Sequence, residues 1–166
     1  MSDFLAILRD ADPLTDVMVA RPFVEGVCLC LAEVAPTEGG RFGVTYAMKA
    51  SPPSDEAWHD AAANATTGLM IKGMREQDHE YIVVERENGL ATAILAEPGF
   101  ATNVCEWLQT DRFLVGWSVP DFLVLWRPDS PFSDELGKRI LSAGTPGAIN
   151  LSPAVVLYSD GGFTRT

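Results

Sequence analysis

The pattern of apolar and polar residues divides the chain into strand-like and helix-like segments. "VEGVCLCLAEV", Val24 to Val34, is apolar at both odd and even positions, which is typical of a strand buried on both faces. "FGVTYAMKA" predicts a second strand after the turn-forming "PTEGGR". Segment 51–70, "SPPSDEAWHDAAANATTGLM", then predicts the clearest helix, because Trp58, Ala61 and Ala65 share one face.

The same succession follows in the middle of the chain. "EYIVVERENGLATAILAE" has two apolar runs around Asn88-Gly89, a dipeptide that favours a two-residue hairpin turn with two positive φ angles. The next segment carries Val104, Trp107 and Leu108 at helical spacing. A second strand pair followed by a helix is therefore expected.

The stretch "VGWSVPDFLVLW", from Val115 to Trp126, has apolar runs on both sides of Pro120-Asp121. Proline has no N–H to donate to a central ladder, so a hairpin turn at Pro120 is the preferred interpretation. One bent strand with a bulge at Val119-Pro120 is the alternative. A helix with Leu136 and Ile140 facing inward follows, and then the final strand "AVVLY".

These elements together predict one α+β domain over residues 1–166. Strands that come in adjacent pairs imply a mainly antiparallel sheet, here built from three strand-strand-helix units with the helices on one face. An N-terminal helix capped by Ser2 is also expected, from the apolar residues Phe4, Leu5, Ile7 and Leu8.

Charge and composition limit the classes of function. The 166 residues carry a net charge of -11 and no cluster of Lys or Arg, which argues against binding nucleic acid or an anionic membrane. The acidic balance fits solubility and also a basic partner protein. The first residues lack the features of a signal peptide, and the three cysteines form no disulfide framework, so a cytoplasmic location is predicted.

No residue pattern predicts catalysis, a metal site or a cofactor. His59 and His79 have no sequence neighbour that would make either a base, and Cys28 and Cys30 lack the two further ligands that zinc requires. Cys105 lies in the first turn of a predicted helix, where its thiol pKa would fall, but the adjacent Glu106 opposes that shift. An enzyme with a site assembled from distant residues stays open.

The aromatic residues of the third strand pair indicate a binding surface instead. If the helices cover one face of the sheet, its other face needs an N-terminal helix, a second copy or a partner to cover it. On this interpretation Trp117, Phe122 and Trp126 are the anchors, and Asp121 and Glu106 lie on the rim. The competing interpretation places the three aromatic residues in the core.

Two segments resemble a known family. "WHDAAANATTGL" at 58–69, and "FLVGWSVPDFLVLW" at 113–126 followed by a helix and "LSPAVVLYSDGGF", are similar to the YtpQ-type family of bacterial proteins. That family usually has an Arg before the Asp of the hairpin, where this chain has Pro120 before Asp121. The resemblance implies a bacterial cytoplasmic protein with no assigned activity, and it supplies no catalytic residues.

Three functional hypotheses follow. The preferred one is a non-catalytic, acidic protein-binding module of the immunity type or the secretion-chaperone type, with a basic partner protein or a homodimer as the expected assembly. The second is a small-molecule-binding domain with Trp117 and Trp126 in the wall of its pocket. The third is an enzyme that uses Cys105 or the two histidines.

Overall fold

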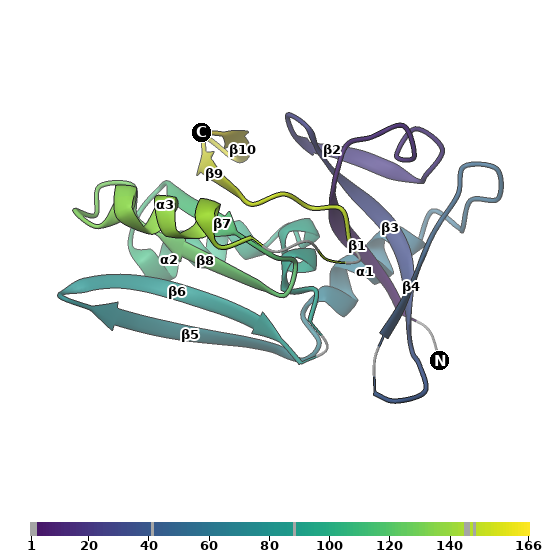
Figure 1. Cartoon of the computed structure of the whole chain (residues 1–166), viewed down its shortest axis with the longest axis horizontal. Helices are drawn as coiled ribbons and strands as arrows, with labels where there is room; N and C mark the ends of the chain where they lie inside the picture. The colour runs from purple at the N-terminus through teal and green to yellow at the C-terminus, as the bar shows by residue number, and fades with distance from the viewer. Residues whose placement is uncertain (1–2, 41, 88, 145–146, 148) are drawn as a thin grey trace.

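The computed structural model describes residues 3–40, 42–87, 89–144, 147 and 149–166 (Figure 1). Its strands are β1 (Asp3–Asp10), β2 (Ala20–Val24), β3 (Val27–Pro36), β4 (Phe42–Tyr46), β5 (Leu69–Glu76), β6 (His79–Arg86), β7 (Phe113–Trp117), β8 (Phe122–Trp126), β9 (Ala154–Ser159) and β10 (Gly162–Arg165). Its helices are α1 (Ala57–Ala65), the 3-10 helix η1 (Ala91–Ala96), α2 (Phe100–Leu108) and α3 (Ser133–Ser142).

The chain is α+β, and its strands form two antiparallel sheets. In the four-stranded sheet β3 pairs with β1 along one side and with β2 and β4 in succession along the other. The second sheet has six strands in the order β10-β9-β7-β8-β6-β5. The antiparallel pairing is confirmed. A single sheet is wrong, because the first predicted strand pair and the two later ones lie in different sheets.

The predicted N-terminal helix is also wrong, because residues 3–10 form β1. Four consecutive side chains of this strand, Leu5 to Leu8, are buried, so both of its faces pack against other elements. β1 pairs with β3 over its whole length and α1 packs against it. A short apolar run fits a helix and a doubly buried strand equally well, and only the surrounding elements decide between them.

The second strand pair forms at a different place from the predicted one. Asn88 lies outside the described residues, and the run after it forms η1 rather than a strand. β6 instead forms a hairpin with β5, and the two strands meet at a tight turn in which Gln77 and Asp78 both have positive φ. The predicted helix over 51–70 correspondingly ends at Ala65, and its last residues enter β5.

The third strand pair is the predicted hairpin. β7 and β8 pair antiparallel, with Val115 opposite Leu125, and Pro120 lies in the turn between them. The bent-strand alternative is therefore excluded. The turn predicted at Gly161-Gly162 forms one residue earlier, at Asp160 and Gly161, and Gly162 begins an additional strand, β10, that pairs with β9.

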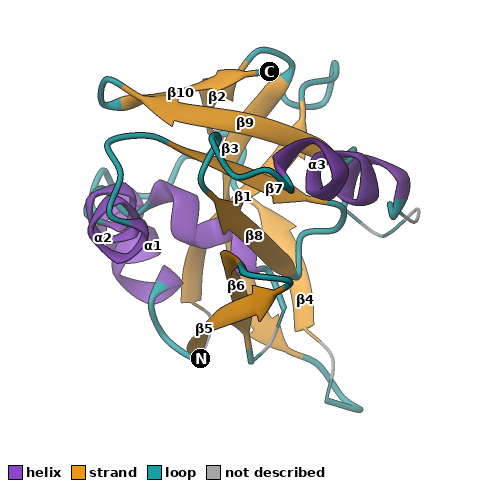
Figure 2. Cartoon of the chain, turned by 90° about the vertical axis from the view of Figure 1, so that its left-hand side faces the viewer, coloured by secondary structure: helices purple, strands orange, loops and turns teal. Residues whose placement is uncertain are grey.

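The helices do not share one face, contrary to the prediction. The residues of β7 and β8 alternate between two apolar clusters: Val115 and Leu125 pack with Val104 of α2, whereas Val124 packs with Ile140 of α3. Figure 2 shows α2 and α3 on opposite sides of the six-stranded sheet. Both faces of the sheet centre are thus covered from within the chain.

One buried cluster joins the two sheets. It contains Leu5 and Ile7 of β1 together with Phe113 and Leu123 of the six-stranded sheet. The segment that leads into β9 runs back to the end of β1 (Figure 1), where the Ser152 N–H donates to an Asp10 carboxylate oxygen over 2.9 Å. This packing sets the relative position of the two sheets.

Candidate functional site

Trp117 and Trp126, the predicted binding anchors, belong to the core. Their exposed fractions are 0% and 1%. The Trp117 indole N–H donates to the Ser152 carbonyl oxygen at 3.1 Å, and the Trp126 indole N–H donates to Ser133 Oγ at 2.8 Å. Each ring packs among apolar residues, and its indole N–H has a hydrogen-bond acceptor, as a buried tryptophan requires. The anchor prediction is therefore wrong for both, and the competing core interpretation is correct.

Of the other three predicted site residues, only Phe122 packs in the same cluster as one of these rings, that of Trp126. Phe122 is half-buried and packs with the cluster beneath α3. Glu106 is exposed on α2, which covers the opposite face. The Asp121 carboxylate accepts the Leu90 N–H over 3.3 Å. Leu90 has a φ of 61°, so this carboxylate holds a left-handed turn that leads into η1.

The candidate catalytic residues are separated as well. His59 is exposed on α1, whereas the half-buried His79 ring stacks on Phe132 at a centroid distance of 5.5 Å. Burial, with a contribution from the charge of Asp111, raises the pKa of the Cys105 thiol. A thiol held in its protonated form is a poor nucleophile, so the geometry gives the cysteine hypothesis no support.

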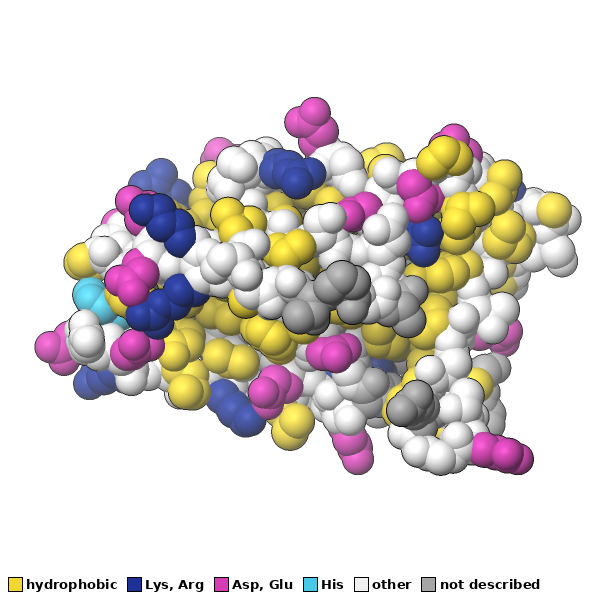
Figure 3. All heavy atoms as spheres, viewed as in Figure 1, with side chains coloured by type: hydrophobic (Ala, Val, Ile, Leu, Met, Phe, Trp, Pro, Cys, Tyr) yellow, Lys and Arg dark blue, Asp and Glu magenta, His cyan; other side chains and the backbone are white. Residues whose placement is uncertain are grey.

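The feature that sequence reasoning missed is the exposed edge strand β5. It is the last strand of the six-stranded sheet and pairs only with β6 among the described residues. Met70 is 45% exposed, Ile71 43% and Met74 42%, which is unusual for three large apolar side chains in one strand. Figure 3 shows hydrophobic side chains between charged ones along this part of the molecule. The spacing of Met70 and Met74 fits a helix equally well, which concealed the strand.

A groove of about 440 Å³ lies beside β5. Ile71 and Gly73 line it from the edge strand, and Trp107 and Leu108 line it from the end of α2. Trp107 is 46% exposed although its predicted position was on the buried face of the helix. The edge strand and the groove together form a continuous surface, which we call the β5 edge: Met70, Ile71, Gly73, Met74, Trp107 and Leu108.

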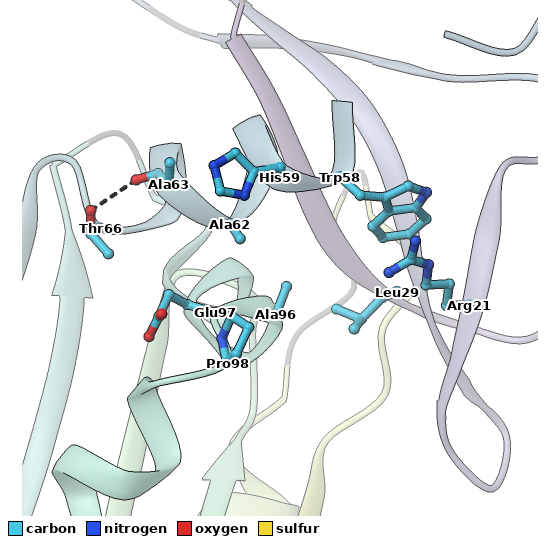
Figure 4. A pocket seen from close by; sticks show the side chains of 10 residues that line it. All are labelled: Arg21, Leu29, Trp58, His59, Ala62, Ala63, Thr66, Ala96, Glu97 and Pro98. Carbon is cyan, nitrogen blue, oxygen red and sulfur yellow. Dashed lines mark hydrogen bonds between the residues drawn. The ribbon is translucent and has the colours of Figure 1, made fainter. Parts of the chain in front are cut away.

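A second concavity, a cleft of about 550 Å³, lies where α1, the end of η1 and the four-stranded sheet meet (Figure 4). Its apolar lining comes from Leu29, Trp58, Ala62, Ala63, Ala96 and Pro98, and its polar lining from Arg21, His59, Thr66 and Glu97. The guanidinium carbon of Arg21 is 4.1 Å from the centre of the Trp58 ring. We call this concavity the Trp58 cleft.

Within residues 3–40, 42–87, 89–144, 147 and 149–166, no three His, Cys, Asp or Glu side chains are grouped so that they could hold a metal ion. In the same part of the chain, every helix is too short or too polar to cross a membrane.

Comparison of the chain with protein-family models, with curated proteins and with solved structures gives no significant match. The resemblance to the YtpQ-type family therefore stays a prediction.

Proposed function

We propose that the protein is a non-catalytic protein-binding module, of the immunity type or the secretion-chaperone type, and that the β5 edge is its binding element. The observation that carries the proposal is an eight-residue edge strand whose inner residues are all exposed. An open edge presents a row of unpaired N–H and C=O groups to which a strand of another chain can add. Native edges are usually short, covered or charged to prevent such pairing.

The direction of the backbone groups follows from the turn between β5 and β6. Glu76 and His79 close a two-residue turn, so they are the last hydrogen-bonded pair of the hairpin. Because hydrogen-bonded and non-bonded pairs alternate in an antiparallel ladder, the backbone groups of Ile71, Gly73 and Arg75 point toward the open edge. A strand that adds to β5 would bond to these three residues.

The groove gives such a strand side-chain contacts on one face. Ile71 and Gly73 lie on the same face of β5, and Trp107 and Leu108 form the far wall. Alternate side chains of an added strand point to this face, and apolar ones among them would fill the groove. The occupant is thus an extended segment with apolar residues at every second position.

The charges along β5 are already neutralised within the chain. Lys72 pairs with Glu85 at 2.6 Å, and Arg75 pairs with Glu80 across the hairpin. The β5 edge therefore discriminates little between partner strands of different charge. The net charge of -11 acts at longer range, where it would speed association with a basic protein and make the rate depend on salt.

The first test is the mass in solution by light scattering, at low and at high salt, on the wild type and three variants. Gly73→Pro removes an outward N–H, and Ile71→Asp places a charge in the groove. Leu141→Asp is the matched control, because Leu141 is 52% exposed on α3, away from the β5 edge. A dimer that both edge variants abolish and the control retains would identify a second copy as one occupant.

If the wild type is monomeric, the next experiment is to select ligands for it from a library of displayed random peptides. We expect enrichment of segments with alternating apolar residues, with binding lost in Gly73→Pro and Ile71→Asp but kept in Leu141→Asp. A monomer from which no such segments are enriched, or binding that survives both edge variants, would contradict the proposal.

A further inference from the structure

Among the described arginines, Arg21 and Arg112 have guanidinium groups without a hydrogen bond or ion pair, and of these two only Arg21 stacks on an aromatic ring. Arg75, Arg127 and Arg139 form ion pairs with carboxylates. The Arg165 guanidinium donates to the Glu25 carbonyl oxygen. Arg21 makes no hydrogen bond or ion pair with any residue that the structure describes, although the protein is strongly acidic.

The stack on Trp58 fixes the Arg21 guanidinium without using its donors. A guanidinium stacked on an aromatic face keeps its N–H groups directed outward in its own plane. Figure 4 shows this group at one end of the Trp58 cleft, beside the indole of Trp58 and near Leu29. The Arg21 guanidinium therefore lies at the border of the cleft, and its N–H groups are available to a ligand.

The remaining polar groups of the cleft leave the Arg21 end open to an anion. His59 lines the cleft from the next position of α1, and Figure 4 shows its ring directed away from Trp58 and Arg21, on the side of Ala62 and Glu97. The Glu97 carboxylate accepts the Gly99 N–H at 3.0 Å, and it lies at the opposite end from Arg21 in Figure 4. The acidic residues Asp55, Glu56 and Asp60 at the start of α1 do not line the cleft.

We propose that the Trp58 cleft binds a small monocarboxylate with a flat apolar body. One guanidinium neutralises one negative charge and fits a carboxylate through two parallel hydrogen bonds. Ala62, Ala96 and Pro98 provide a smooth apolar surface for the body of the ligand. The volume of about 550 Å³ lies within the range of small-molecule sites. This site is separate from the β5 edge and does not depend on the function proposed for that surface.

Three probes of the same shape test the charge requirement: benzoate, benzamide and benzamidine. The chain has only two histidines, so proton NMR resolves His59 in the cleft and His79 as an internal control, with His59→Gln and His79→Gln to assign the signals. Benzoate is expected to shift the His59 ring signals saturably and to leave those of His79 in place. Benzamide and benzamidine are expected to bind at least about tenfold more weakly, because they lack the charge-assisted hydrogen bonds.

Two variants test the role assigned to Arg21. Arg21→Gln is expected to weaken benzoate binding at least about tenfold, and Arg21→Lys to weaken it less, because the charge remains but the fork is lost. Arg112→Gln is the matched control, since Arg112 is also exposed but lies outside the cleft. Circular dichroism checks that each variant is folded. Benzoate that gives no saturable shift, benzamide that binds equally well, or Arg21→Gln that binds like the wild type would each overturn the proposal.

Discussion

β1 and β5 have the same length, eight residues, and the same position, at one edge of their sheets, but opposite surroundings. α1 packs against β1, and the Asn64 side-chain amide donates to the Phe4 carbonyl oxygen at 3.1 Å. β5 has no such cover among the described elements, and its large apolar side chains are exposed. An edge covered by a helix is a part of the core, whereas an open edge of equal length is a surface on which another strand can bind.

The largest expected difference concerns one substitution made in both strands. Ile7 is fully buried in β1 and Ile71 is 43% exposed in β5. Ile7→Ala is expected to lower the free energy of unfolding by about 2–5 kcal/mol, because it leaves a cavity in the core. Ile71→Ala is expected to lower it by less than about 1 kcal/mol. Urea denaturation of both variants measures the difference, and equal losses would refute the contrast between the strands.

The second prediction tests the burial around β1 through pH. Cys30 lies opposite Ile7 on β3, and burial raises its pKa from 9.0 to about 11. The unfolded chain therefore releases the thiol proton at a lower pH than the folded protein. The contribution of the protonated Cys30 thiol to the free energy of unfolding is therefore fully present below about pH 9. Above that pH, the contribution falls by about 1.4 kcal/mol per pH unit.

Urea denaturation at pH 8, 9 and 10 measures that slope. Cys30→Ala should remove it, while Cys105→Ala should change it less, because Cys105 is only half-buried. A wild type whose stability is unchanged over this range would show that the Cys30 thiol is accessible to solvent.

The third prediction concerns the helix that covers β1. Asn64→Ala removes the donor to the Phe4 carbonyl oxygen and is expected to cost about 1–2 kcal/mol of stability. Asn103→Ala on α2 is the matched control, since Asn103 is exposed and the change in helix propensity is the same. Thermal denaturation should separate the two variants, and identical melting temperatures would show that the contact with β1 contributes nothing.

The smallest effect is expected on the open strand. Lys72→Ala breaks the exposed ion pair with Glu85, in which the Lys72 side chain is 54% exposed. The expected loss is about 0.2–1 kcal/mol at low salt and less at high salt. A double-mutant cycle with Glu85→Ala isolates the pair. A coupling well above this range would mean that β5 is more rigid and less solvated than its exposure indicates.

The predicted binding residues show which features a local sequence pattern can and cannot predict. Trp117, Phe122 and Trp126 were predicted as anchors on the assumption that all helices cover one face of the sheet. α3 covers the face that this assumption left open, so Trp126 is buried beneath it. The Trp58 cleft was not predicted, since Arg21 and Trp58 are 37 positions apart and no local pattern connects them.

The sequence alone determined the features that depend on neighbouring residues. Proline without an N–H placed the β7–β8 turn, the Gly161-Gly162 dipeptide marked the last turn to within one residue, and amphipathic spacing located α1, α2 and α3. Tertiary structure decided what depends on distant partners. Residues 3–10 became a strand because β3 pairs with one edge of it, the cluster with Phe113 and Leu123 buries one face, and α1 buries the other. β5 became an open edge because no other strand of the described chain pairs with its outer side. Periodicity records which side chains point together, but burial depends on what the rest of the chain places against them.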